Sequence, residues 1–302
     1  MKKLFCALLS AVTAVALLCA FTPLEQENSA GLTTQSYETA AGIQTIAISD
    51  KYADVTIQSA DLDHIIAEYS YSSAYGAAFS VGEPLYNFTV SGDALTIQKS
   101  KDPSADFPLI QGSNTDRSCA LTVKLPRRAF ATVSADTTNG SITVNELSAQ
   151  TVSLSTQNGS IIFTGGSLGN VTATAVNGRV ESNNSAFQTL NASARNGKVS
   201  LVNVSALSIT ADAQNGSIKL DTVSSPAYYC TVTNSSIVGT LVGRAADYAF
   251  DLTPGNGRVT VTDDSDGSFS LRSSGPVQQG QGSAQSFTAK ASNGSVNLEF
   301  LG

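Results

Sequence analysis

Hydrophobic and polar residues alternate on both sides of an Asn-Gly pair that recurs through the middle of the chain. The members of this series are Asn139, Gly140, Asn158, Gly159, Asn177, Gly178, Asn196, Gly197, Asn215, Gly216 and Asn234, the last followed by Ser. Each asparagine lies nineteen positions after the one before it, with no insertion. In each copy the residues six and four positions before the Asn and three after it are apolar, as at Val152, Leu154 and Ile161. This period-two alternation predicts two β-strands per repeat, each with one buried face.

Two architectures can use such a repeat. Asn-Gly between alternating apolar residues is typical of a two-residue hairpin, so one candidate is an antiparallel meander. The other is a β-solenoid, in which each Asn-Gly forms a corner and each coil stacks on the next. We favour the solenoid, because stacking explains why the period never changes, whereas hairpin loops tolerate insertions. It also predicts that the Asn side chains form a hydrogen-bonded ladder and that Gly supplies a positive φ at the corner.

The flanking regions extend this pattern less regularly. Residues 43–131 contain short alternating strands and predict an irregular β cap, and residues 132–302 predict the repeats. Further Asn-Gly pairs at Asn256 and Asn293 predict two more coils, with a degenerate coil around Phe269 and Leu271 between them. The Gly- and Gln-rich stretch 275–285 predicts a flexible loop. The fold class is therefore all-β, a single-stranded, β-helix-like solenoid of about nine coils.

The N-terminal residues predict a targeting signal. Two lysines precede an apolar run at 4–21, so residues 1–24 predict a signal peptide or an N-terminal membrane anchor, with residues 25–42 as a linker. The sequence leaves cleavage or retention open, and only 4–21 is expected to contact the membrane. The body of the protein would then lie outside the cytoplasm. Cys119 and Cys230 fall too many coils apart for a disulfide, so we expect two buried free thiols.

Composition excludes several functions. The net charge is −7 and no segment is strongly basic, which argues against nucleic acid as a partner. His64 is the only histidine, so multi-histidine metal sites and most histidine-based catalysis are excluded. We expect no cofactor and no catalytic residues.

Two weak binding candidates remain. Asp263, Asp264 and Asp266 precede a glycine and could hold Ca²⁺ loosely, against the simpler interpretation of a charged turn. Tyrosines gather ahead of the repeats, and a recognition surface there would use Tyr69, Tyr71, Tyr75 and Tyr86. The competing interpretation of these tyrosines is ordinary strand packing.

The segments LTVKLP (121–126) and VSADTTNGSI (133–142) resemble a bacterial adhesin-like family of surface proteins, a domain of unknown function. The resemblance covers about 43–302. It implies an exported leader, a β cap and Asn/Ser-Gly coils, and it offers no catalytic residues to carry over.

The expected function is that of a non-catalytic, exported or envelope-anchored bacterial surface protein, serving as a spacer or interaction module. Its partner would be a protein or a glycan at the cell surface. One alternative is an envelope-stress regulatory component that binds a membrane partner. A second is a polysaccharide-active enzyme, which would need carboxylates on neighbouring coils. The acids of the coils, Asp136, Glu146, Glu181, Asp212 and Asp221, occupy different positions of the repeat.

Overall fold

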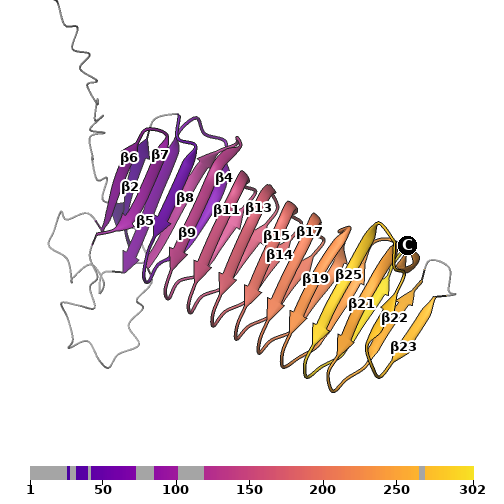
Figure 1. Cartoon of the computed structure of the whole chain (residues 1–302). Coiled ribbons are helices and arrows are strands. Elements are labelled where there is room, and N and C mark those ends of the chain that lie inside the picture. The colour runs from indigo at the N-terminus through magenta and orange to yellow at the C-terminus, as the bar shows by residue number, and fades with distance from the viewer. Residues whose placement is uncertain (1–25, 28–31, 40–41, 73–84, 101–118, 265–268) are drawn as a thin grey trace, which may run out of the picture.

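The computed structural model describes residues 26–27, 32–39, 42–72, 85–100, 119–264 and 269–302, which form two long β-sheets wound into one elongated stack (Figure 1). In spatial order, sheet A contains β1 (Gln26–Glu27), β2 (Leu32–Thr39), β5 (Ile65–Ser72), β8 (Cys119–Pro126), β4 (Asp54–Ala60), β10 (Ile142–Asn145), β12 (Ile161–Thr164), β14 (Val180–Asn183), β16 (Val199–Val202), β18 (Ile218–Val223), β20 (Ile237–Leu241), β26 (Val296–Phe300), β22 (Val259–Asp263) and β23 (Ser270–Ser273). Sheet B contains β24 (Val277–Gln279), β21 (Tyr248–Pro254), β25 (Gln285–Ala291), β19 (Ala227–Val232), β17 (Ser205–Ala213), β15 (Ala186–Ala194), β13 (Ser167–Ala175), β11 (Ser148–Thr156), β9 (Phe130–Thr137), β3 (Thr45–Ser49), β7 (Ala94–Lys99) and β6 (Tyr86–Ser91). A short 3-10 helix, η1 (Ala245–Asp247), precedes β21.

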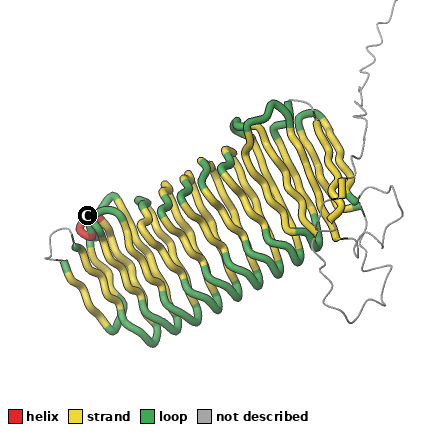
Figure 2. Tube along the Cα trace, turned by 180° about the vertical axis from the view of Figure 1, so that it is seen from behind, coloured by secondary structure: helices red, strands yellow, loops and turns green. Residues whose placement is uncertain are grey.

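Each regular coil is one long strand of sheet B followed by one short strand of sheet A. Parallel pairing places each residue beside its own copy in the next repeat: Val152 pairs with Val171, and Ile142 pairs with Ile161. This register confirms the solenoid and excludes the hairpin meander. The successive coils and their corners are visible from behind in Figure 2.

The interior is filled by the apolar rows that the alternation predicted. One row of sheet B is at most 1% exposed at four successive copies, Val133, Val152, Val171 and Leu190. The row two positions on is narrower, and its members Ala135, Leu154 and Ala173 are almost fully buried. Since stacked coils share one cross-section, a residue in a row must match the size of its neighbours above and below, which explains why the rows vary so little.

The asparagines form the ladder at one corner. Asn158 Nδ2 donates to Asn139 Oδ1 at 2.7 Å, and the same bond repeats between successive copies up to Asn234. It then continues to Asn293 at 2.9 Å and from there to Asn256 at 3.0 Å. These eight side chains tie every coil from β9–β10 to β21–β22 to its neighbour.

The reason for glycine at this corner differs from the expectation. Gly140 and its copies are not among the residues with positive φ, so the prediction of a left-handed corner glycine is wrong. A Cβ at Gly159 would lie only 1.9 Å from the carbonyl oxygen of Gly140. Glycine is therefore required because the stacked backbones approach too closely for any side chain. Positive φ occurs instead at the other corner, at Glu146, Gly165 and their copies Asn184, Asn203 and Thr222.

The coils at both ends stack out of sequence order. The last coil, β25–β26, lies between β19–β20 and β21–β22, so that Val296 pairs with both Ile237 and Val259. At the other end β3–β4 stacks directly on β9–β10, and β7 and β8 lie outside it. Region 43–131 thus forms the N-terminal end of the stack and also supplies in-register coil strands: Ile46 pairs with Val133.

Antiparallel strands close both ends. At the N-terminal end β6 pairs with β7, and β5 and β2 extend sheet A beyond β8. Tyr37 of β2 and Phe88 of β6 stack with ring centroids 4.1 Å apart, which joins the two sheets there. At the C-terminal end β23 and β24 pair with β22 and β21. The predicted degenerate coil around Leu271 is present as one further strand in each sheet, β23 and β24, with the turn between them at 274–276, but both strands run antiparallel to their neighbours. The predicted flexible loop 275–285 therefore contains strand β24. Outermost strands can pair in either direction, since no further coil follows them.

Two further findings concern the cysteines and the membrane. Cys119 and Cys230 are buried and form no disulfide, as expected. Within the described ranges, no helix has the length and apolar character needed to cross a bilayer. The apolar run 4–21 lies outside the described residues. The segment 25–42, predicted as a linker, contains strands β1 and β2 and so belongs partly to sheet A.

Candidate functional site

A buried ionic cluster lies where β3 ends, near the N-terminal end of the stack. Asp50 follows Ile46 and Ile48 in the inward row, and its Oδ1 accepts hydrogen bonds from the backbone N–H groups of Tyr52 at 2.6 Å and Ala53 at 2.7 Å. Thr137, at the end of the neighbouring strand β9, does the same for the N–H of Gly140. Asp50 therefore holds the corner of its own coil in the way a threonine holds the next one.

Three side chains from other strands surround this carboxylate. The Tyr86 hydroxyl donates to Asp50 Oδ2 at 2.5 Å, and Lys99 Nζ lies 3.6 Å from the same oxygen. Lys99 Nζ also donates to Cys119 Sγ at 3.4 Å and lies 5.2 Å from the centre of the Tyr86 ring. The side chains of Asp50 and Lys99 are 0% and 7% exposed, so the ion pair is almost completely removed from water.

The environment fixes the protonation of these groups. Burial would raise the pKa of Asp50, but the Lys99 ammonium, the two backbone N–H groups and the Tyr86 hydroxyl together hold it below its usual value. Burial raises the pKa of Tyr86 and that of Cys119, and the nearby negative charge of Asp50 adds to both. Asp50 is therefore a carboxylate, whereas the phenol and the thiol stay neutral.

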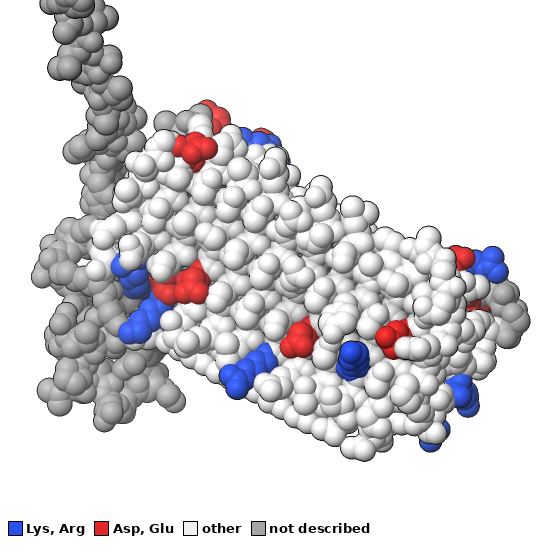
Figure 3. Space-filling model, in the orientation of Figure 1, with Lys and Arg blue, Asp and Glu red and all other residues white. Residues whose placement is uncertain are grey.

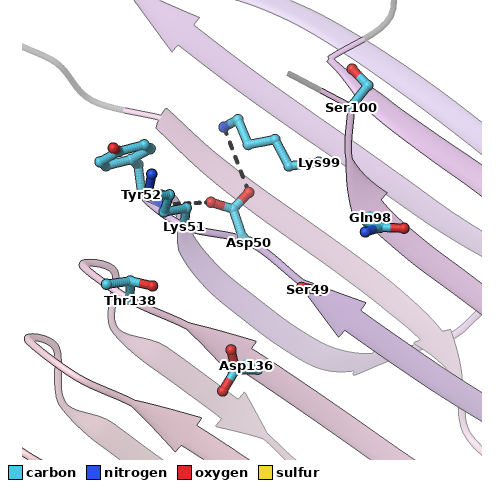
Figure 4. A pocket seen from close by; sticks show the side chains of 9 residues that line it. All are labelled: Ser49, Asp50, Lys51, Tyr52, Gln98, Lys99, Ser100, Asp136 and Thr138. Atoms are coloured by element: carbon cyan, nitrogen blue, oxygen red, sulfur yellow. Dashed lines mark hydrogen bonds and ion pairs between the residues drawn. The ribbon is translucent and has the colours of Figure 1, made fainter. Parts of the chain in front are cut away.

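A hollow of about 420 Å³ lies over this cluster (Figure 4). It is lined by Ser49, Asp50, Lys51, Tyr52, Gln98, Lys99, Ser100, Asp136 and Thr138. We call it the Asp136 pocket, after its one exposed carboxylate. Nearly all of its side chains are polar, which makes it a place to bind a hydrogen-bonding ligand and a poor place for an apolar one.

The pocket arises from the register of three adjacent strands. Ser49 of β3 pairs with Gln98 of β7 on one side and with Asp136 of β9 on the other. All three side chains are exposed and point outward from sheet B. The corner residues Lys51, Tyr52 and Thr138 complete the lining beside this row.

Sequence reasoning missed this site, although a signal was present. The inward row of β3 reads Ile46, Ile48, Asp50, and that of β7 reads Leu95, Ile97, Lys99. An acidic and a basic residue therefore continue two buried rows at the same position. Because β3 and β7 are neighbours in register, the two charges meet.

The predicted tyrosine surface is wrong for the residues that can be judged. Tyr69 and Tyr86 are 0% and 1% exposed, and their ring centroids lie 4.9 Å apart in the core. Both occupy inward positions of their strands, so the packing interpretation holds. Tyr75 lies outside the described residues, as does the side chain of Tyr71.

Of the predicted calcium candidate, the structure describes Asp263 and Asp264. Asp263 is 4% exposed, and its Oδ2 accepts a hydrogen bond from the Ala245 N–H at 2.7 Å, so this carboxylate caps η1 from inside. Asp266 lies outside the described residues. Among the residues that are described, no three His, Cys, Asp or Glu side chains gather as a metal site would require. His64 contacts Asp63 at 2.6 Å and lies 3.9 Å from Glu38.

The carboxylates of the coils do not pair up. Glu181 lies between Ile162 and Ser200 in its row, and Asp212 lies between Ser193 and Thr231. The register neighbours of Asp136 and Asp221 are all uncharged. Glu146 Oε2 accepts a hydrogen bond from Arg127 at 2.9 Å. Charged groups are few on the face shown in Figure 3, and several of the acidic groups lie beside Lys or Arg. Neighbouring acids of the kind that polysaccharide cleavage uses are thus not found among these five.

Several solved structures align with most of this chain at low sequence identity. One from Parabacteroides distasonis, described as a "putative lipid binding protein", has a TM-score of 0.47 and 10% identity, and the alignment covers 88% of this chain and 96% of that one. A second from the same species and one from Parabacteroides merdae are each described as a "putative adhesin". Their TM-scores are 0.45 and 0.44 at 12% and 11% identity, and the alignments cover 89% and 88% of this chain and 97% and 95% of theirs.

None of the curated proteins matches the chain. A family model does match, and it covers residues 43–299, which is the whole described stack except for its first two strands and its last residues. By this match the chain belongs to the Toastrack DUF4097 family, a domain of unknown function.

Proposed function

We propose that this protein is a non-catalytic, exported component of the bacterial cell envelope that acts as a rigid spacer and interaction module. The observation that carries the proposal is the continuous strand pairing of the stack from the β7–β8 strands to the β21–β22 coil, in which both sheets run without a gap. Export and anchoring rest on the apolar run 4–21 and its preceding lysines.

Rigidity follows from how the coils are joined. Each coil from β9–β10 to β21–β22 is tied to the next by two parallel strand pairings and by one Asn–Asn bond at the corner, and a single apolar core runs through the stack. Sheet B contains 12 strands, so at about 4.8 Å per strand the stack is about 50 Å long. A body of this shape holds its two ends at a fixed separation.

The spacer role is tested by changing the length of the stack by one coil. Deleting residues 158–176 joins Gln157 to Asn177 and keeps the repeat pattern. We expect the shortened chain to fold and to be exported, while any activity that depends on reach from the envelope decreases. Recovery of the full-length chain from the cytoplasm, or cleavage of a polysaccharide by the purified chain, would refute the proposal.

A further inference from the structure

The Asp136 pocket presents a row of unused hydrogen-bonding groups. Within the part of the chain that the structure describes, the side chains of Ser49, Gln98 and Asp136 make no hydrogen bond or ion pair. They occupy one register row on three adjacent strands, so the row is about 10 Å long at about 4.8 Å per strand. This is the width of one sugar ring with its hydroxyl groups.

The kinds of groups in the row match a polyhydroxylated ligand. The Asp136 carboxylate can accept two hydrogen bonds from neighbouring hydroxyls, and the Gln98 amide and the Ser49 hydroxyl can each donate and accept. Thr138 adds a second hydroxyl to the lining, and Tyr52, whose half-buried ring has Lys51 Nζ 5.3 Å from its centre, is the one aromatic residue of the lining (Figure 4).

The charges of the pocket favour an uncharged ligand. Its lining holds two ammonium groups, Lys51 and Lys99, and two carboxylates, Asp50 and Asp136, so the formal charges cancel. The charge of Lys99 is compensated by Asp50 at 3.6 Å beneath the surface. An anion would meet the exposed Asp136 carboxylate, and a cation would meet Lys51, so neither is selected over a neutral molecule.

The floor of the pocket is held in place before any ligand binds. The Asp50 carboxylate is held by two backbone N–H groups, the Tyr86 hydroxyl and Lys99, which fixes the end of β3 relative to β7. The β3–β9 pairing fixes the backbone position of Asp136 beside Ser49. Such preorganisation lowers the entropic cost of binding a small polar ligand.

We propose that the Asp136 pocket binds one uncharged sugar residue of a surface polysaccharide, with Asp136 accepting from two neighbouring sugar hydroxyls. This inference rests on the proposed function, because it takes the protein to lie where polysaccharides are present. It gives the interaction module a ligand class and a location, at the N-terminal end of the stack.

Saturation-transfer NMR on the purified full-length chain tests the proposal with glucose, galactose, mannose and N-acetylglucosamine as probes and inorganic phosphate as the anionic probe. We expect saturation of at least one of the sugars. Asp136→Ala should weaken its binding about tenfold or more, the usual effect of removing a charged hydrogen-bond acceptor. Gln98→Ala should weaken it less, because an uncharged group is lost.

Asp212→Ala is the matched control. Asp212 occupies the same outward position of its strand, four coils along the row from Asp136, and lies outside the pocket. It should leave sugar binding unchanged. The pocket proposal is overturned if none of the sugars binds, if phosphate alone binds, or if both aspartate variants lose binding equally. Each of these results leaves the spacer role standing, since that role is judged by export and by coil deletion.

Discussion

Replacing Gly178 with alanine tests the central packing feature of the stack. Gly178 has no positive φ, so the added methyl group costs nothing in backbone conformation. It would, however, lie 1.7 Å from the carbonyl oxygen of Gly159 in the coil below, where real Cβ atoms essentially never come closer than 3.0 Å. The two coils must therefore move apart at this corner by the difference between these two distances, or the corner must rebuild.

The cost follows from the hydrogen bonds at the same corner. Asn177 N donates to Gln157 O, and Asn177 Nδ2 donates to Asn158 Oδ1, each at 2.7 Å. A displacement of that size would lengthen both beyond hydrogen-bonding distance. With about 1 kcal/mol for each bond and a further penalty for the groups left without a partner, the free energy of unfolding should decrease by about 2–4 kcal/mol.

Urea unfolding followed by circular dichroism measures this change. Gly275→Ala is the control, because an added Cβ there has no atom within 4 Å and the φ of Gly275 is not positive. The control should stay within about 0.5 kcal/mol of the parent chain. If Gly178→Ala is as stable as Gly275→Ala, the coils are not in the close contact described here, and the reason given for glycine at every ladder corner is wrong.

Three further predictions concern strain, pH and the thiols. Thr222→Asn should raise the free energy of unfolding by about 1 kcal/mol, because a β-branched residue at φ 56 is strained. The new Asn can also continue the series of side-chain hydrogen bonds in which Asn203 Nδ2 donates to Asn184 Oδ1. A lower urea midpoint would contradict this. The folded protein lowers the pKa of Asp50, so the contribution of this carboxylate to stability is present above its unfolded pKa of about 3.8 and is lost as the pH falls through the folded value. The difference in free energy of unfolding between the parent chain and Asp50→Asn should therefore decrease in acid. A difference that increases in acid would refute the ion pair. Burial raises the pKa of the Cys230 thiol to about 12, so peptide mapping after iodoacetamide treatment should find Cys119 and Cys230 unlabelled in the native chain and labelled in urea. Labelling of both thiols without denaturant would show that the core opens.

Much of the fold could be predicted from the sequence, because in a stack of repeats of equal length each residue pairs with the equivalent residue of the next repeat. Asn158 and Asn177 stack because every residue between them has an equivalent above and below, and no long-range information is needed. The sequence shows that glycine recurs at this corner, but the predicted reason, a positive φ, was wrong. The true reason is the close approach of two coils, which is a tertiary contact that the sequence of one repeat does not reveal.

The candidate site could not be predicted in this way, because it belongs to an irregular end of the stack. Asp50 and Lys99 are far apart along the chain, and no fixed period relates them. Only the pairing of β3 with β7 brings the two charges together, and only the pairing of β3 with β9 adds Asp136 to the same row.

The sequence alone therefore determined the cross-section of this protein: the repeating coil, its two strands, its buried rows and its asparagine corner. The tertiary structure decided the order of the coils at the ends. The coil β25–β26, although last in the sequence, lies between β19–β20 and β21–β22 in the stack. In this position Phe287 of β25 stacks on Tyr228 of β19 with ring centroids 4.7 Å apart. The physical reason is that an open strand edge accepts any strand of matching pattern, so packing at the edge, and not position along the chain, selects the neighbour.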